Sequence, residues 1–487
     1  MAGLFRRLLA SAAAYQTPSI VSSLLALVTL RLYTGHLTTT DYGYAENLLT
    51  AIIFTSILLR FGLGEAVLRF WFDDDPRRRA ALARTVTATV LWSSTAVALV
   101  ALPFAGRLAW LLLHTHDATL MGFGILGLWA FTNLEVAYAL LRVEERRRVY
   151  VIAAVGNVLL TVALTIALVV VADGGARGYV FGNYGASTAV LLALWVTQRH
   201  HVALAPPQRL GGLLRFGLPT IPADAAAFAL NVVDRTYILH ADSAAASGRY
   251  AFAAKLSTVV IVALRGFQAA WPPLAYSVTD EAQAARLYAR VTTAYVATTG
   301  LVVCGVALVG RWAVRAFAAR PDFYGASDAL PWVALGWALY GLVLVLITVA
   351  GRAKVTTRNF PATAAGLVVN VVLLVLLVGP LGIAGAGIAL CGAYLVILLV
   401  LHLLTRRLFH VPFERRRLIA AVTVLTAVAV GGELLLPTHG AAGLVERLAL
   451  LACVPPLLVA AGVVTPGELR ALARMRPRRP AAAHDVR

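Results

Sequence analysis

The chain has 487 residues, of which 60% are hydrophobic and only 13% are charged, and its formal net charge is +19 at pH 7. So few charged side chains do not cover the surface of a water-soluble protein of this length. A strongly basic balance also occurs in nucleic-acid-binding proteins, but here the arginines fall between apolar stretches and not in one patch. The composition therefore predicts a membrane protein and argues against nucleic acid as a partner.

Apolar stretches of about 17 to 25 residues follow one another along almost the whole chain, and a helix of about 20 apolar residues crosses a bilayer. We therefore expect an all-α polytopic membrane protein with about 14 transmembrane helices and short loops. The expected spans are 14–32, 44–64, 85–104, 119–141, 150–172, 179–197, 214–239, 250–270, 291–309, 330–350, 362–378, 385–404, 418–436 and 444–464.

Basic residues alternate between the two ends of these spans. If the N-terminus is cytoplasmic, the loops that return to its side hold most of the arginines, including the triplets at 77–79, 146–148 and 415–417, and so does the C-terminal tail. Positive residues are retained on the cytoplasmic side of a membrane. We therefore expect a multi-pass protein of the bacterial inner (cytoplasmic) membrane with both termini in the cytoplasm.

Two parts of the chain resemble each other. Segments 146–185 and 352–392 each contain a basic loop, an apolar span with an early asparagine, and a glycine-rich turn. Parallel repeats of this kind form two lobes in many transporters. We expect an N-terminal six-helix lobe over 1–205, a C-terminal six-helix lobe over 206–410, and a terminal helix pair with a basic tail over 411–487.

Several motifs are similar to those of a known family. They are Arg31-Leu32-Tyr33 followed by Asp41-Tyr42-Gly43, the segment Gly248-Arg249-Tyr250 to Lys255, and the stretch from Asn370 to Pro380-Leu381-Gly382 and Gly385-Ala386. Through them the chain resembles the polysaccharide and oligosaccharide flippases of the MOP superfamily, which also includes the multidrug extruders (MATE) and the lipid II flippases. The resemblance implies two lobes around a central cavity, alternating access, and an undecaprenyl-diphosphate-linked glycan as substrate.

Ionisable residues within the expected spans are the candidate functional residues, because each costs about 2.5 to 3.5 kcal/mol to insert. Lys255, Thr258 and Arg265 recur at helical spacing and predict a polar stripe on the eighth span. Guanidinium and ammonium groups bind phosphate oxygens, which favours a cationic cavity for a diphosphate head group. An alternative for arginines near helix ends is snorkelling to the interface. The candidate residues of this cavity are Arg31, Arg60, Arg235, Lys255 and Arg265.

Three acidic residues, Asp234, Asp224 and Glu135, are candidates for binding H⁺ or Na⁺ as a coupling ion. A desolvated carboxylate exchanges protons nearer to neutral pH. The alternative is a structural ion pair, such as Asp234 with a basic residue of a neighbouring helix, and for Asp224 a polar helix start after Pro222. The pair His200-His201 offers too few ligands for a zinc site. Nucleotide-binding and nucleophile motifs are absent from the sequence, so we expect no metal, no cofactor and no enzymatic activity.

These observations predict a flippase that translocates a lipid-linked (polyprenyl-diphosphate) oligosaccharide for cell-surface polysaccharide synthesis, such as lipopolysaccharide or exopolysaccharide. Its expected partners are that substrate, membrane lipids, H⁺ or Na⁺, and a polysaccharide polymerase or glycosyltransferases. Two alternatives stay open, namely an ion-coupled drug or small-molecule exporter of the same superfamily and a polyprenyl-dependent membrane glycosyltransferase or polymerase. The enzyme needs acidic catalytic residues on a sizeable outer loop, and the expected loops are short.

Overall fold

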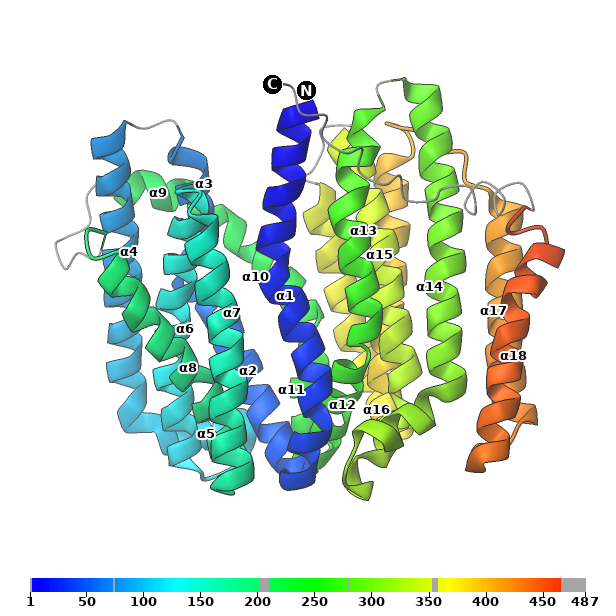
Figure 1. Cartoon of the computed structure of the whole chain (residues 1–487), viewed down its shortest axis with the longest axis horizontal. Coiled ribbons are helices and arrows are strands. Elements are labelled where there is room, and N and C mark those ends of the chain that lie inside the picture. Colours follow the sequence, from blue (N-terminus) through cyan, green and yellow to red (C-terminus); the bar gives the residue numbers. More distant parts are fainter. Residues whose placement is uncertain (1, 73–74, 202–209, 279, 353–357, 466–487) are drawn as a thin grey trace, which may run out of the picture.

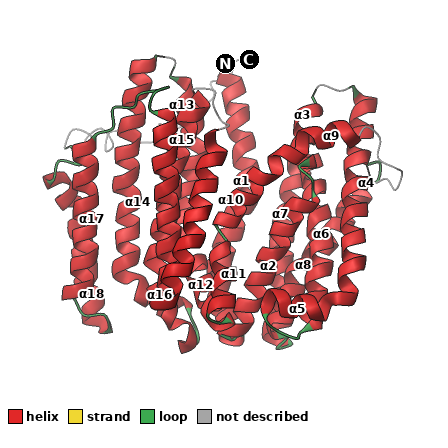
Figure 2. Cartoon of the chain, turned by 180° about the vertical axis from the view of Figure 1, so that it is seen from behind, coloured by secondary structure: helices red, strands yellow, loops and turns green. Residues whose placement is uncertain are grey.

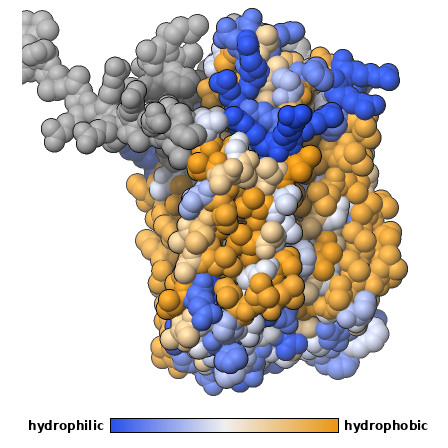
Figure 3. Space-filling view, turned by 90° about the vertical axis from the view of Figure 1, so that its right-hand side faces the viewer, coloured by the Kyte–Doolittle hydropathy of each residue, from blue (hydrophilic) through white to orange (hydrophobic). Residues whose placement is uncertain are grey.

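The computed structural model describes residues 2–72, 75–201, 210–278, 280–352 and 358–465. Within these ranges every regular element is a helix, and most helices run side by side along one direction (Figures 1 and 2). The face in Figure 3 has an apolar band around its middle and hydrophilic residues at both ends. A protein that spans a bilayer has this distribution, and the expected all-α membrane class is confirmed.

The N-terminal helices pack into one group, which we call the N-terminal bundle. Within it α6 packs against α2, α4 and α8, and α1 packs against α7. The short helices η1 (Leu102–Phe104) and η2 (Ile166–Val171) continue α4 and α7. The main helices are α1 (Ala2–His36), α2 (Thr39–Leu59), α3 (Leu63–Phe70), α4 (Pro76–Ala101), α5 (Ala105–Leu113), α6 (Ala118–Val143), α7 (Arg147–Thr165) and α8 (Gly175–Thr197).

Local sequence explains where the helices of this bundle begin. The Thr38 hydroxyl accepts from the backbone N–H of Asp41, and the Asp41 carboxylate accepts from the backbone N–H of Thr38. This reciprocal capping box sets the start of α2. The Asp75 carboxylate caps α4 by accepting from the backbone N–H of Arg78, with Pro76 at the first helical position.

The following helices form a second group, the C-terminal bundle, in which α15 packs against α13, α14 and α16. Helix α9 instead packs against α3 of the N-terminal bundle. The elements are α9 (Leu210–Gly217), η3 (Leu218–Thr220), α10 (Ile221–Leu230), α11 (Val233–Ala241), α12 (Ala244–Leu256), α13 (Thr258–Ser277), α14 (Glu281–Phe317), η4 (Pro321–Asp328), α15 (Leu330–Arg352) and α16 (Asn359–Thr405).

The described helices include 12 candidate membrane spans, so the expected number of 14 is not confirmed. One difference lies in α16, which covers two expected spans and consists of helical segments that meet at Gly382, where φ is 56°. The other lies in the expected span 250–270, which is divided into α12 and α13 at Ser257. The polar stripe from Lys255 to Arg265 was predicted on one continuous helix, and this division corrects that assumption.

The largest buried apolar cluster contains residues of both bundles. Tyr42 of α2 and Phe323 of η4 belong to it, and their ring centroids lie 5.9 Å apart in an edge-to-face arrangement. Because α1 runs from the N-terminal end of the molecule to the start of α2, this shared core lies toward the opposite end (Figure 1). The two bundles are therefore joined by apolar packing at the end away from the N-terminus.

Helices α17 (Arg415–Leu435) and α18 (Gly440–Ala460) form a pair that packs on α14 (Figure 1). Arg447 of α18 has no exposed surface. Its guanidinium donates to the carbonyl oxygens of Leu308, Leu436 and Pro437 at 3.0 to 3.1 Å, and to the Glu433 carboxylate at 3.0 Å. These bonds satisfy a charge that would otherwise be costly to bury, and they connect the pair to α14.

We predict that Arg447→Ala destabilises the protein by about 3 to 5 kcal/mol, because it leaves three carbonyl oxygens and one oxygen of Glu433 without their donor and removes a fully buried side chain. Arg311→Ala is the matched control, since Arg311 pairs with the other oxygen of Glu433 from a side chain that is 35% exposed. Its loss should cost less than about 1 kcal/mol. Thermal unfolding in detergent measures both effects, and equal losses would contradict a special role of burial at Arg447.

Candidate functional site

Helices α2 and α12 of the two bundles meet at two glycines. A Cβ atom at Gly43 would lie 1.9 Å from the carbonyl oxygen of Ala244, and a Cβ atom at Gly248 would lie 1.9 Å from that of Thr39. Glycine is therefore required at both positions for the two backbones to approach this closely. We call this contact, formed by Thr39, Gly43, Ala244 and Gly248, the interbundle seam.

Buried hydrogen bonds extend the interbundle seam by one turn. The side-chain amide of Asn47 on α2 donates to the Ser247 hydroxyl on α12 at 2.7 Å. The same hydroxyl donates to the carbonyl oxygen of Arg235 at 2.9 Å. Asn47 is 3% exposed and Ser247 is fully buried. Since buried polar groups are costly without partners, these bonds favour the closed arrangement of α2 and α12.

A cluster of charges lies beside the seam. The Glu46 carboxylate on α2, with its side chain 5% exposed, accepts from the Arg235 guanidinium on α11 and from the Lys255 ammonium on α12, each at 3.1 Å. The Tyr179 hydroxyl on α8 also donates to it at 3.1 Å. We call these four residues the Glu46 cluster. Two of its members come from each bundle, so it is an ionic link between the bundles.

The Glu46 cluster has an excess of positive charge, because one carboxylate faces two cations. The side chains of Arg235 and Lys255 are 18% and 28% exposed, more than that of Glu46. Both were predicted as cavity residues, but their pairing with Glu46 was not. The spacing Gly43, Glu46, Asn47 and Thr50 places these residues on one face of α2, and this helical pattern is the sequence signal by which Glu46 could have been found.

A second ionic group contains Arg60 at the end of α2. Its guanidinium donates to the Glu135 carboxylate of α6 at 3.3 Å, and these side chains are 27% and 26% exposed. Asp224 of α10 lies near enough to Arg60 for their charges to attract each other. The contact with Glu135 agrees with the ion-pair alternative for that residue, and Asp224 lies in the first turn of α10, beside Pro222.

The other two basic candidates are placed differently. Arg31 is exposed on α1, and its guanidinium donates to the carbonyl oxygen of Ala316 near the end of α14. Arg265 belongs to α13, but its side chain lies outside the described part of the structure. Of the five basic residues predicted to share one cavity, the described contacts thus bring together only Arg235 and Lys255.

A buried polar group lies where the chain breaks between α10 and α11. Asp234, in the first turn of α11, is 1% exposed, and one carboxylate oxygen accepts from the Tyr250 hydroxyl at 2.7 Å. Asn370 of α16, which is fully buried, interacts with Asp234. The remaining oxygen of Asp234 and the amide oxygen of Asn370 have no hydrogen-bond donor. Interrupted helices with spare acceptors of this kind form cation sites in transporters.

Comparison with known proteins adds evidence from outside the chain. Residues 36–320 match a family described as polysaccharide biosynthesis protein. A comparison with curated proteins gives no match.

Solved structures give close similarity in fold at low sequence identity. The lipid II flippase MurJ in an inward closed conformation superposes with a TM-score of 0.75 at 13% identity, over 94% of this chain and 99% of that chain. An inward-facing multidrug resistance MATE family transporter of the MOP superfamily gives 0.62 at 17% identity, over 84% and 96% of the two chains. The Vibrio cholerae MATE transporter VcmN in its bent form gives 0.53 at 15%, over 84% and 99%. At this identity the similarity establishes the fold.

We predict that Gly43→Ala separates the interbundle seam, because the added methyl group would overlap the Ala244 carbonyl oxygen. A cysteine at position 247, introduced as Ser247→Cys in a background without the native cysteines, should react with a polar thiol reagent about tenfold faster when Gly43→Ala is present. Gly64→Ala is the control, since nothing lies within 4 Å of a Cβ atom there. If the cysteine at position 247 is unreactive with Gly43→Ala, with Gly64→Ala and with neither change, the seam accommodates the methyl group without opening.

Proposed function

The chain belongs to the polysaccharide biosynthesis protein family, and on this premise we propose that it translocates a lipid-linked, polyprenyl-diphosphate oligosaccharide across the cytoplasmic membrane by alternating access. The fold that it shares with the lipid II flippase and with MATE transporters supports this proposal. The observation that carries it is the Glu46 cluster, in which two basic side chains at the junction of the bundles share one carboxylate.

The Glu46 cluster supplies a way for an anionic substrate to be recognised. A diphosphate linkage offers more negative charge and more acceptor oxygens than a single carboxylate. It would therefore compete with Glu46 for Arg235 and Lys255. Arg31, Arg60 and Arg265 complete the proposed set of substrate-binding cations.

The replacement of Glu46 by phosphate as the partner of Arg235 and Lys255 would link substrate binding to opening of the interbundle seam. Glu46 belongs to the N-terminal bundle, whereas Arg235 and Lys255 belong to the C-terminal bundle. When phosphate replaces the carboxylate, the ionic link between the bundles is lost and the closed seam is favoured less. A ligand shifts a conformational equilibrium only through such a difference in affinity between the two states.

The distribution of arginines indicates which end of the protein faces the cytoplasm, and so the direction of the proposed transport. The N-terminal end carries most of the basic loops and is the proposed cytoplasmic side, so the interbundle seam closes the site toward the outside. The glycan and diphosphate would enter between the bundles while the polyprenyl tail stays in lipid. Keeping the tail in lipid avoids a cost of about 0.8 kcal/mol for each CH₂ group transferred to water.

Asp234 is the residue that we propose as the site for H⁺ or Na⁺. Glu135 forms an ion pair with Arg60, and Asp224 is exposed, whereas Asp234 is buried. Asp234 has a hydroxyl as its hydrogen-bond partner and keeps one buried oxygen without a donor. A carboxylate in that position gains most from a proton or a small cation.

The Glu46 cluster also bears on the alternatives. Its excess positive charge disfavours export of a cationic drug, because the substrate would be repelled where the bundles meet. A glycosyltransferase or polymerase would change the glycan covalently, whereas a flippase returns it unaltered. The two properties that separate the three functions are therefore the charge of the cargo and its covalent state after transport.

We predict that the purified protein in liposomes moves a fluorescent polyprenyl-diphosphate glycan across the bilayer without altering it. Lys255→Gln should slow this movement by about tenfold or more, because one of two cations for the phosphates is lost. Arg286→Gln, a change at an exposed position of α14, should leave the rate unchanged. Recovery of a lengthened glycan would favour the enzyme, and movement of a cationic drug with no effect of Lys255→Gln would favour the exporter.

A second prediction concerns coupling. If Asp234 binds the coupling ion, Asp234→Asn should abolish the response of flipping to an imposed H⁺ or Na⁺ gradient while preserving the size of the side chain. Asp224→Asn and Glu135→Gln should retain that response, since Asp224 is exposed and Glu135 is paired with Arg60. The rate with and without each gradient measures the effect, and a response that disappears only in Asp224→Asn would transfer the role to that residue.

A further inference from the structure

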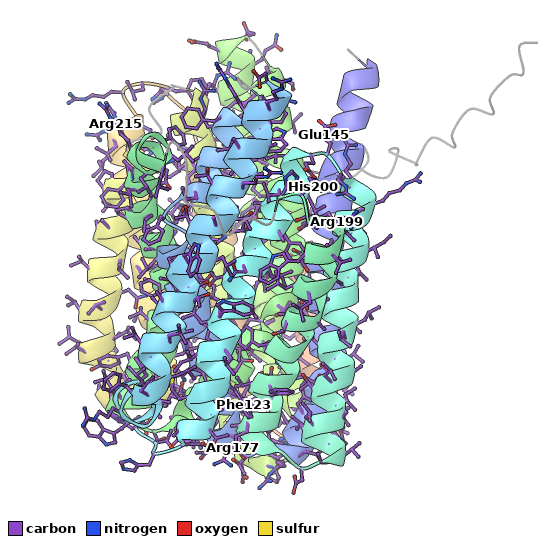
Figure 4. All side chains as sticks on the ribbon, turned by 90° about the vertical axis from the view of Figure 1, so that its left-hand side faces the viewer. Phe123, Glu145, Arg177, Arg199, His200 and Arg215 are labelled. Carbon is purple, nitrogen blue, oxygen red and sulfur yellow. The ribbon has the colours of Figure 1, made fainter. Side chains whose placement is uncertain are left out.

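Three potential metal ligands gather at the N-terminal end of the N-terminal bundle. Glu144 ends α6, and His200 and His201 follow the end of α8. One ligand atom from each residue lies within 4.8 Å of the others. Figure 4 places His200 at the same end of the molecule as Glu145 and Arg199, and away from Arg177. This end is the proposed cytoplasmic side, outside the helical core that holds the Glu46 cluster.

The ligand atoms are largely buried and incompletely satisfied. His201 is 5% exposed, and its Nε2 atom contacts the Oε1 atom of Glu144 directly. The Nδ1 atom of His201 and the Oε2 atom of Glu144 are buried and have no hydrogen-bond partner. Nearly all buried polar atoms in proteins are hydrogen-bonded, so these two atoms show that the contact between His201 and Glu144 does not satisfy either side chain.

We propose that Glu144, His200 and His201 form a binding site for Zn²⁺. Two imidazoles and one carboxylate are a common zinc ligand set, with water in the fourth position. Zn²⁺ would bind the Nε2 atom of His201 and an oxygen of Glu144, and the direct contact between these side chains would open to admit the ion. The proton of the His201 ring would then move to the Nδ1 atom, which has no hydrogen-bond partner in the structure. His200 is exposed and would add its imidazole from the solvent side.

Two arginines beside the site limit its affinity. Arg146 lies 3.7 Å from the Glu144 Oε2 atom, and Arg84 donates to the His200 carbonyl oxygen at 2.9 Å. Both positive charges oppose a divalent cation. The Arg146 side chain is 36% exposed and its contact exceeds hydrogen-bond length, so it can move into solvent when the ion binds. The site should therefore bind Zn²⁺ specifically but with moderate affinity.

A bound ion would connect three parts of the N-terminal bundle. Glu144 contributes α6, the two histidines contribute the turn after α8, and Arg84 adds α4 through the His200 carbonyl oxygen. Zn²⁺ would thus fix the point at which the chain leaves the N-terminal bundle. The predicted effect is on stability, and it does not depend on which substrate the protein transports.

The test uses tag-free, chelator-treated protein in detergent, titrated with ZnCl₂ alone by calorimetry. We expect one Zn²⁺ per chain, with an affinity reduced more than about tenfold by His200→Ala and by Glu144→Gln. His410→Ala, a change at an exposed histidine outside the cluster, should bind as the unchanged protein does. Zn²⁺ should raise the melting temperature of the unchanged protein and of His410→Ala, but not of the two cluster variants.

Several results would overturn the proposal. They are the absence of saturable binding, equal affinity in all variants, or an X-ray absorption spectrum of the bound zinc without imidazole ligands. His201→Ala alone would not decide the question, because the buried His201 also contacts Glu144 and its loss can impair folding. His200→Ala removes a ligand from the exposed side and keeps the test valid if His201→Ala fails to fold.

Discussion

The close approach of α2 and α12 at Gly43 and Gly248 is the constraint on which the polar contacts between the bundles depend. With no side chain between the two backbones, the next turn of α2 brings Glu46 and Asn47 within hydrogen-bond distance of partners on the other bundle. In hydrocarbon a charge needs such a partner at short range. Larger residues at the glycine positions would hold the bundles apart and leave Glu46 buried without its cations.

The described buried charges differ in how completely they are compensated, and this difference suggests their roles. Arg447 is surrounded by carbonyl oxygens and a carboxylate, which suits a permanent structural contact. Glu46 has charged partners from the opposite bundle, which suits a contact that forms in one transport state and breaks in another. Asp234 is bonded to a hydroxyl and retains an unsatisfied oxygen, which suits a group that exchanges an ion.

Composition and hydropathy were sufficient to predict the helical membrane fold, because a bilayer imposes a length and an apolar composition on each span. They did not predict the break at Ser257, where neither proline nor glycine marks the sequence. The family resemblance, stated from short motifs, is confirmed by the match to the polysaccharide biosynthesis protein family, and the fold that it implies is shared with MurJ and a MATE transporter. The division into lobes at residues 205 and 410 stays a prediction.

The candidate site was predicted in part. Lys255 and Arg235 were recognised as unusual charges inside spans, but their common partner lies 209 and 189 residues away along the chain. Periodicity within one helix carries no information about such a distance. The same reason explains why the sequence analysis found too few zinc ligands around His200 and His201. Glu144 contacts His201 in space but precedes it by 57 residues along the chain. Pairing across helices is a property of packing, and it became visible only in three dimensions.

The attachment of α17 and α18 has a consequence for how the two bundles would tilt in the alternating access that we propose. The pair packs mainly on α14, and Arg447 fixes it there, so the pair must tilt together with the C-terminal bundle. A wider body of helices displaces more lipid when it tilts, and each helix must keep its apolar length matched to the bilayer. Resistance from the membrane is therefore larger for the C-terminal bundle, and the narrower N-terminal bundle is expected to perform most of the tilting.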